Sequence, residues 1–125
     1  MSVLIDSSVW IEYFRGSQKA EPLDFLIDEN LIVINDLILA ELLPGLYLCR
    51  EQRLISLLRE VKRLPISVDW DNLITMRTDC LREGINRVGI PDLIIAQQAI
   101  RNRLNLYSFD RHFRLLAGIF PLDLY

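Results

Sequence analysis

The sequence has too few cysteine and histidine residues for several common protein classes. Among its 125 residues there are two cysteines, Cys49 and Cys80, and one histidine, His112. Two cysteines cannot form the disulfide framework of a small secreted domain, and they are typical of free thiols in a reducing compartment. Together with a single histidine they also cannot supply the four ligands of a zinc finger. We therefore expect a cytoplasmic protein without disulfides or structural zinc.

Membrane-spanning segments and phosphate-binding loops are missing as well. The longest apolar stretch, residues 31–46, contains Asp36 and Glu41 and reaches Pro44 near its end, so it is not expected to span a bilayer. The N-terminal residues have no basic segment of the kind that begins a secretory signal. None of the five glycines belongs to a GxxxxGK[ST] or GxGxxG motif. We expect no membrane attachment and no nucleotide bound by either motif.

Lysine is scarce, although positive charge is not. Lys19 and Lys62 are the only lysines, so 12 of the 14 cationic residues are arginine, against 17 acidic residues and a net charge of −3. The protein as a whole is therefore not a basic nucleic-acid-binding protein. Arginine can bind a phosphate through two parallel hydrogen bonds, which lysine cannot do. The chain thus carries the side chain that suits local phosphate contacts.

Short apolar segments alternate with helical patterns along the whole chain. With 125 residues, 51% of them hydrophobic, the chain can build one core, and we expect a single domain over residues 1–125. The expected strands are 3–5, 31–34, 64–66, 104–107 and 119–122, the last of them at a sheet edge. The helices between them include an amphipathic helix over 51–63 and another over 93–102. This alternation predicts an α/β fold, a three-layer α/β/α sandwich with a mostly parallel central sheet.

Carboxylates stand at several points where strands pass into helices. Asp6 follows the first expected strand, Asp92 begins a helix, and Asp110 follows the fourth strand. Each of them alone is well explained as a helix N-cap, a position that aspartate favours. In parallel sheets, however, binding sites form beyond the carboxyl ends of the strands. The three side chains are therefore also candidates for one shared site.

Glu41 is not explained by helix capping. It lies inside the most apolar helical pattern of the chain, between Ala40 and Leu42, and we expect it to be nearly buried. A buried glutamate needs a partner or a metal ion, and two carboxylates about 4 Å apart repel by ~4 kcal/mol at an effective dielectric constant of ~20. Four converging carboxylates therefore favour a hard divalent cation, Mg²⁺ or Mn²⁺. Such ions activate water for phosphodiester hydrolysis, which is the chemistry that we predict.

Other proteins with acidic sites do not fit these residues. A response-regulator receiver needs an adjacent acidic pair after its first strand, whereas Asp6 is followed by Ser7 and Ser8. A phosphatase of the haloacid-dehalogenase type needs Asp-x-Asp at the same place, and position 8 is again serine. His112 and Asp110 do not belong to a catalytic triad, because the sequence has no nucleophile elbow.

Four segments together resemble the PIN-domain ribonucleases. They are LIDSSVWIEYFRG at 4–16, LILAELLPG at 37–45, GIPDLIIAQQAI at 89–100 and LYSFDRHF at 106–113. Their order and their coverage of nearly the whole chain are most similar to the VapC toxins of toxin–antitoxin pairs. The resemblance implies a Mg²⁺- or Mn²⁺-dependent endoribonuclease that cleaves single-stranded RNA, is usually a homodimer, and is neutralised by a cognate antitoxin.

The resemblance also implies roles for individual residues. The acidic positions of the family are all filled, by Asp6, Glu41, Asp92 and Asp110. Asp6 and Asp92 would be the main metal ligands, Glu41 would bind metal or position water, and Asp110 would complete the site. Ser7 and Ser108 occupy positions where the family often has a supporting hydroxyl, although threonine is common at the second of them.

Several arginines lie close to these motifs in the sequence and could form a basic rim around the acidic site. The candidates for RNA contacts are Arg15, Arg87, Arg101 and Arg111. The alternative for each is an exposed helix position with an ordinary ion pair. Trp10 could stack on a base, but its helical spacing beside an expected strand favours the core.

Two other functions stay open at the level of the sequence. The chain could be a PIN-fold module that binds RNA or protein without cleaving it, although the complete acidic set favours cleavage. It could also be an RNA-processing nuclease that is not a toxin, because a domain sequence does not distinguish these two roles.

Overall fold

A five-stranded parallel sheet lies at the centre of the computed structural model, which describes residues 1–125. The strands are β1 (Val3–Ile5), β2 (Ile32–Ile34), β3 (Lys62–Arg63), β4 (Asn105–Tyr107) and β5 (Asp123–Leu124). Their order in the sheet is β3-β2-β1-β4-β5, and every neighbouring pair is parallel. The predicted α/β fold with a parallel central sheet is confirmed.

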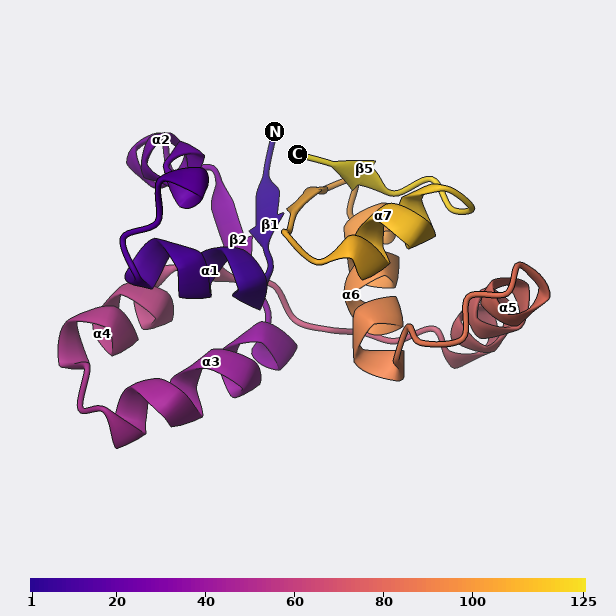
Figure 1. The fold of residues 1–125 in the computed structure, drawn as a ribbon, viewed down its shortest axis with the longest axis horizontal. Coiled ribbons are helices and arrows are strands. Elements are labelled where there is room, and N and C mark those ends of the chain that lie inside the picture. Colours follow the sequence, from indigo (N-terminus) through magenta and orange to yellow (C-terminus); the bar gives the residue numbers. More distant parts are fainter.

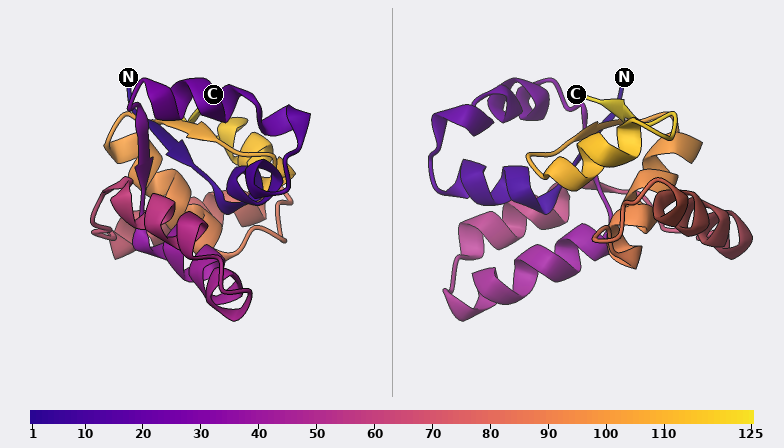
Figure 2. Two further views of the ribbon diagram at one scale, coloured as in Figure 1. Left: turned by 90° about the vertical axis from the view of Figure 1, so that its left-hand side faces the viewer. Right: turned by 45° about the vertical axis from the view of Figure 1, so that its right-hand side comes forward.

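Helices cover both faces of this sheet (Figure 1). On one face lie α1 (Ser7–Phe14), α2 (Pro22–Asp28), α3 (Asp36–Leu48) and α4 (Gln52–Glu60), with the short 3₁₀ helix η1 (Gln18–Ala20) between α1 and α2. On the other lie α5 (Trp70–Arg82), α6 (Ile90–Arg101) and α7 (Arg111–Ala117), with α5 outermost against α6 (Figure 2). The result is the three-layer arrangement expected from the sequence. None of these helices combines the length and the hydropathy needed to cross a membrane.

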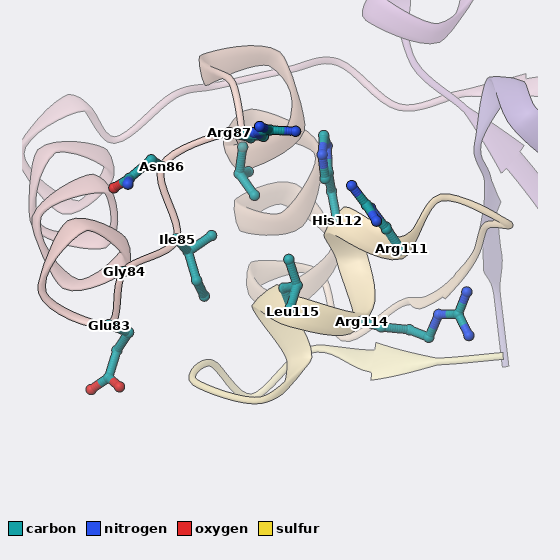
Figure 3. A pocket seen from close by; sticks show the side chains of 10 residues that line it. Glu83, Gly84, Ile85, Asn86, Arg87, Arg111, His112, Arg114 and Leu115 are labelled. Carbon is teal, nitrogen blue, oxygen red and sulfur yellow. The ribbon is translucent and has the colours of Figure 1, made fainter.

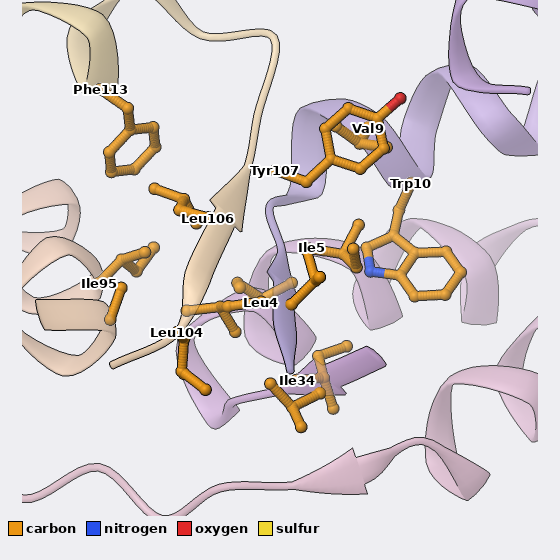
Figure 4. Close-up of a cluster of buried hydrophobic side chains, with 14 of the residues drawn as sticks. Leu4, Ile5, Val9, Trp10, Ile34, Ile95, Leu104, Leu106, Tyr107 and Phe113 are labelled. Carbon is orange, nitrogen blue, oxygen red and sulfur yellow. The ribbon is translucent and has the colours of Figure 1, made fainter. Parts of the chain in front are cut away.

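The two central strands are buried on both sides. Leu4 pairs with Leu106 and Ile5 with Tyr107, and all four side chains are buried. Because successive side chains of a strand point to opposite faces, Leu4 and Leu106 face α6 and α7, whereas Ile5 and Tyr107 face α1 (Figure 4). Trp10 of α1 is fully buried in this second layer, so it belongs to the core. Burial on both faces explains why these strands read as continuous apolar segments.

The edge strands do not lie where the apolar pattern placed them. β3 is formed by Lys62–Arg63 and not by 64–66, and β5 is formed by Asp123–Leu124 and not by 119–122. The helix expected over 51–63 ends at Glu60, before β3. Both edge strands are short and exposed. Three of their four residues, Lys62, Arg63 and Asp123, are polar, so these strands carry little apolar signal. An apolar pattern therefore locates central strands better than edges.

Buried amide side chains connect the sheet to the helices. Asn35, fully buried after β2, accepts a hydrogen bond from the Ile38 amide at 2.9 Å and so caps α3. Its Nδ2 donates to Oε1 of Gln98 on α6 at 2.8 Å, and Gln98 in turn donates to the carbonyl oxygen of Pro65 at 3.2 Å. The end of β2, the start of α3 and the middle of α6 are thus held in one arrangement.

A second amide fixes α5 relative to α6. Gln97 Nε2 donates to the Asp69 carbonyl at 2.9 Å and to Asn72 Oδ1 at 2.8 Å, and its Oε1 accepts from the Asp69 amide at 3.1 Å. The segment 83–88 between the two helices is also anchored, because Arg77 donates to the carbonyl oxygens of Ile85 and Asn86, each at 3.4 Å. The connection that leads into α6 is therefore part of the folded structure and not a loose loop.

We expect replacement of Asn35 to separate its two contributions to stability. Asn35→Ala removes the helix cap and leaves Gln98 Oε1 buried without its donor, which should lower the free energy of unfolding by about 2–4 kcal/mol. Asn35→Ser retains a capping oxygen but does not reach Gln98, so it should recover about 1 kcal/mol of that loss. Urea unfolding measures both, with exposed Asn86→Ala as the control that should stay within ~0.5 kcal/mol of wild type. Equal losses for the Ala and Ser variants would contradict the capping role.

Candidate active site

Asp6 lies at the carboxyl end of β1 and is held in place by two serine hydroxyls. The residue is 5% exposed, and its Oδ2 accepts hydrogen bonds from Ser8 Oγ and Ser108 Oγ, each at 2.8 Å. Ser8 Oγ also accepts from the Phe109 amide at 3.0 Å, and Ser108 Oγ from the Asp110 amide at 2.9 Å. The two hydroxyls therefore bind the Asp6 carboxylate to the loop that follows β4.

Only one of the two serines expected to support the carboxylates contacts Asp6. Ser108 does so, but Ser7 is 3.4 Å from Oε2 of Glu41 instead. The second contact with Asp6 comes from Ser8, which was not among the expected supporting serines. Ser7 and Ser8 are consecutive at the start of α1, where neighbouring side chains point in directions about 100° apart. Which of them faces β4 depends on how α1 leaves the sheet, and the sequence carries no signal for it.

Asp92 and Asp110 meet around His112. Asp92 lies in the first turn of α6, and its Oδ2 is 3.1 Å from His112 Nδ1. Asp110 precedes α7, caps it by accepting from the His112 amide at 2.9 Å, and has its Oδ1 3.7 Å from the same Nδ1. One ligand atom from each of these residues lies within 4.8 Å of the others. From the sequence, His112 was considered only for a zinc site and a catalytic triad, and its place beside both carboxylates was not predicted.

The capping explanation applies to Asp110 but not to the other two aspartates. Asp110 accepts from a helix amide, whereas Asp6 occupies the N-cap position of α1 without making a side-chain cap. Asp92 lies inside α6, where Gly89 is the N-cap residue. Capping therefore does not account for the placement of Asp6 and Asp92.

The expectation that Glu41 is nearly buried is wrong. The residue is exposed, because α3 packs on the core through Ile38, Leu42 and their neighbours and leaves the opposite face open. Partial loss of solvent and the negative charge of Asp6 nevertheless raise the pKa of Glu41 above its usual 4.5, with further contributions from Asp92 and Asp110, while the Ser7 hydroxyl lowers it. The four carboxylates are thus close enough to influence one another.

The pKa of Asp92 is raised as well. Burial is the main cause, the hydrogen bond from His112 lowers the pKa, and the charge of Asp110 raises it, as does that of Asp6. Asp92 and Glu41 therefore both lie in a negative potential that a cation would relieve. Asp92 and Asp110, together with His112, form the group of side chains here whose ligand atoms are close enough to hold one metal ion.

The candidate arginines lie in different places. Arg87 and Arg111 line a hollow of about 550 Å³ together with His112 (Figure 3). Arg15 forms an ion pair with Glu12 at 3.6 Å and borders a groove that contains Glu41. The structure does not bring Arg101 to the site. It lies at the other end of α6, about 14 Å along the helix from its first turn, and donates to the Ser67 carbonyl at 2.9 Å.

Comparison with known proteins relates this fold to one family. The family model for the PIN domain matches residues 3–119. No curated protein matches the sequence. Among solved structures, VapBC2 from Rickettsia felis bound to a promoter DNA fragment is similar at 21% identity and a TM-score of 0.79, over 100% of this chain and 98% of that one. FitAcB from Neisseria gonorrhoeae is similar at 20% identity and a TM-score of 0.77, over 98% and 96%.

A third similar structure is the Mycobacterium tuberculosis toxin VapC20, described as cleaving the sarcin–ricin loop. It is 16% identical, with a TM-score of 0.64, over 95% of this chain and 96% of that one. Identities in this range establish a common fold, and this chain spans nearly the full length of each of the three proteins.

The raised pKa values of Glu41 and Asp92 predict how the stability of the metal-free protein depends on pH. The folded protein holds these protons more tightly than the unfolded chain does, so its stability falls as the pH rises from the usual carboxyl values near 4 through the raised ones. Glu41→Gln should reduce this fall and leave metal-free stability at pH 7 equal or higher. It should also reduce the stabilisation gained from Mn²⁺, which for wild type approaches ~2.7 kcal/mol at ~100 times the dissociation constant.

Urea unfolding in EDTA and in Mn²⁺ tests this, with Glu60→Gln on the exposed surface of α4 as the control that changes neither quantity. A Glu41 that serves only to stabilise the fold would give the opposite result. The Gln variant would then lose about 1–3 kcal/mol without metal and retain the full response to Mn²⁺.

Proposed function

The chain belongs to the PIN-domain family, and we propose that it is a metal-dependent endoribonuclease that cleaves single-stranded or loop RNA as the toxin of a toxin–antitoxin pair. The observation that carries this proposal is the cluster of Asp92, Asp110 and His112, whose ligand atoms lie within 4.8 Å of one another. Asp6 adds negative charge that raises the pKa of both Glu41 and Asp92. Maintaining such repulsion is costly for a domain of ordinary stability, and a bound cation is the usual reason for it. We place the enzyme, one domain over 1–125, in the cytoplasm, where its RNA substrate and reduced Cys49 and Cys80 fit.

In this proposal Asp6, Asp92, Asp110 and Glu41 hold Mg²⁺ or Mn²⁺. When bound, the cation lowers the pKa of a water molecule and stabilises negative charge on the phosphodiester. Ser8 and Ser108 fix Asp6 by donating to Oδ2, which leaves Oδ1 as the free ligand atom. His112 orients Asp92 in the same way through Oδ2. Hydrogen bonds to the outer oxygens of metal-binding carboxylates commonly contribute 10- to 100-fold to affinity or activity.

The alternatives differ from this proposal in ways that can be measured. A PIN-fold module that only binds RNA or protein has no need of four carboxylates held together, and it would show no chelator-sensitive cleavage. An RNA-processing nuclease that is not a toxin would cleave RNA in the same way. It would lack a small antitoxin reading frame beside its own gene, and its expression would not arrest growth.

Cleavage should depend on Asp92 and on a divalent cation. We expect the purified protein to cleave a labelled single-stranded RNA in Mg²⁺ or Mn²⁺ and not in EDTA, and Asp92→Asn to lower kcat/KM by at least ~100-fold. Asp69→Asn is the matched control, because asparagine also caps a helix well and Asp69 caps α5 away from the site. Thermal melting verifies that both variants fold. Full activity of Asp92→Asn, or of wild type in EDTA, would contradict the proposed mechanism.

A groove between α1, α3 and α4 supports an antitoxin as the partner. It has a volume of about 450 Å³, six of its ten lining residues are hydrophobic, and Glu41 lies on its border with the acidic site. Leu46 is one of these residues, whereas the neighbouring Tyr47 lies outside the groove and accepts a hydrogen bond from Arg59. We propose that an apolar helix or strand of the antitoxin occupies the groove and places an Arg or Lys near Asp6 and Asp92. The resemblance of the sequence motifs to VapC toxins also leads us to propose a homodimer.

Binding of the antitoxin should therefore depend on one face of α3. Leu46→Glu should weaken the complex at least ~10-fold, because it places a charge in the apolar groove. Leu48→Glu, two residues further along the helix but 86% exposed and outside the groove, should have little effect. Replacing the antitoxin cation by Gln should weaken binding further and reduce its dependence on salt. Equal affinities of the two leucine variants, measured by titration calorimetry, would exclude this groove.

A further inference from the structure

The hollow between segment 83–88 and α7 is a positively charged concave surface beside His112. Its ten lining residues include Arg87, Arg111 and Arg114, and Glu83 is the only acidic one among them. In Figure 3 the side chains of Arg87 and Arg111 lie at the end of the hollow occupied by His112. Those of Glu83 and Arg114 point away from that end. Two guanidinium groups thus lie on the side of the hollow nearest the carboxylates.

These arginines differ from most others in the chain because nothing in the protein pairs with them. Six arginines form ion pairs or donate side-chain hydrogen bonds: Arg15, Arg59, Arg63, Arg77, Arg82 and Arg101. No such partner exists for Arg87, Arg111 or Arg114, which all line this one hollow. Arg77 also holds the backbone of the segment that carries Arg87. Unpaired guanidinium groups on an anchored segment are ready to bind an anion from outside.

His112 connects the hollow with the acidic site. It lines the hollow, and its Nδ1 is 3.1 Å from Asp92 Oδ2. A phosphodiester chain with one phosphate at the carboxylates therefore passes His112 when it continues into the hollow. On the other side of the acidic site, the groove at Glu41 offers a chain of phosphates no such contacts. That groove is mainly apolar and contains Glu51, and its single arginine, Arg15, is paired with Glu12.

We propose that this hollow binds the RNA backbone next to the cleaved phosphate, with Arg87 and Arg111 as ligands of neighbouring phosphate groups. The inference rests on the proposed nuclease function and deepens it, because it gives the substrate strand one path across the protein. The strand runs from the carboxylates past His112 between α7 and segment 83–88, and the apolar groove at Glu41 is left for protein. An acidic protein segment is the other anion that could enter the hollow, and binding of polyglutamate distinguishes it from RNA.

The test compares RNA substrates of two lengths. A single-stranded octanucleotide can reach the hollow from the acidic site, whereas a dinucleotide cannot. Arg87→Ala/Arg111→Ala should raise KM for the octanucleotide about tenfold or more with little change in kcat, and it should leave kcat/KM for the dinucleotide unchanged. The slope of log affinity against log salt for the octanucleotide should become shallower by ~0.7 for each phosphate that an arginine no longer neutralises. Arg87→Lys/Arg111→Lys should be intermediate, because lysine retains the charge but not the two parallel hydrogen bonds.

Two controls make the result specific. Arg114→Ala removes an arginine that lines the same hollow but points away, and Arg50→Ala removes an unpaired arginine after α3, so neither should change KM. An unchanged KM in the double alanine variant, or an equal rise of KM in the controls, would overturn the inference about the hollow. Cleavage by the wild type in the same experiment would still support the proposed nuclease function. Wild type that neither binds nor cleaves RNA would overturn both. Loss of binding to polyglutamate, with RNA cleavage intact, would assign the hollow to an acidic protein.

Discussion

Asp6 accepts hydrogen bonds from Ser8 and Ser108, and these two contacts hold the ends of β1 and β4 together in front of the other carboxylates. Because Ser108 also receives the Asp110 amide, the bonds that fix Asp6 also place the start of α7. His112, in the first turn of that helix, then reaches Asp92 on α6. A continuous set of hydrogen bonds thus runs from the central strand through two helices, and the geometry of the acidic site depends on it.

The rest of the fold has to balance the repulsion that this arrangement creates. The pKa values of Glu41 and Asp92 are raised, so these two groups ionise less readily in the metal-free protein than they do in the unfolded chain. The opposing contributions are a hydrophobic core on both faces of the sheet and buried amides whose hydrogen bonds are satisfied, such as Asn35 with Gln98. Asn35 and Gln98 join the start of α3 to the middle of α6, and these two helices carry Glu41 and Asp92.

The two sides of the acidic site differ in chemical character. Toward α1, α3 and α4 the surface is an apolar groove bordered by Glu41, which suits a protein segment. Toward α6 and α7 it is a hollow with unpaired arginines, which suits a phosphodiester chain. Under the proposed function, a protein inhibitor and an RNA substrate would approach the same carboxylates from opposite layers of the sandwich. Inhibition would then require an antitoxin Arg or Lys at the carboxylates, but no contact between the antitoxin and the arginine hollow.

The sequence by itself determined the α/β class, the central strands, the cap at Asp110, and the acidic residues that we propose for the site. Those features follow from local patterns: strands buried on both faces are continuously apolar, and capping side chains stand at fixed positions before a helix. Tertiary structure alone decided the edge strands, the contact of Ser8 with Asp6, the exposure of Glu41, the contact of His112 with Asp92 and the separation of Arg101 from Arg87 and Arg111. Each of these depends on which way a side chain or an edge points once distant segments pack, and local sequence carries no information about that direction.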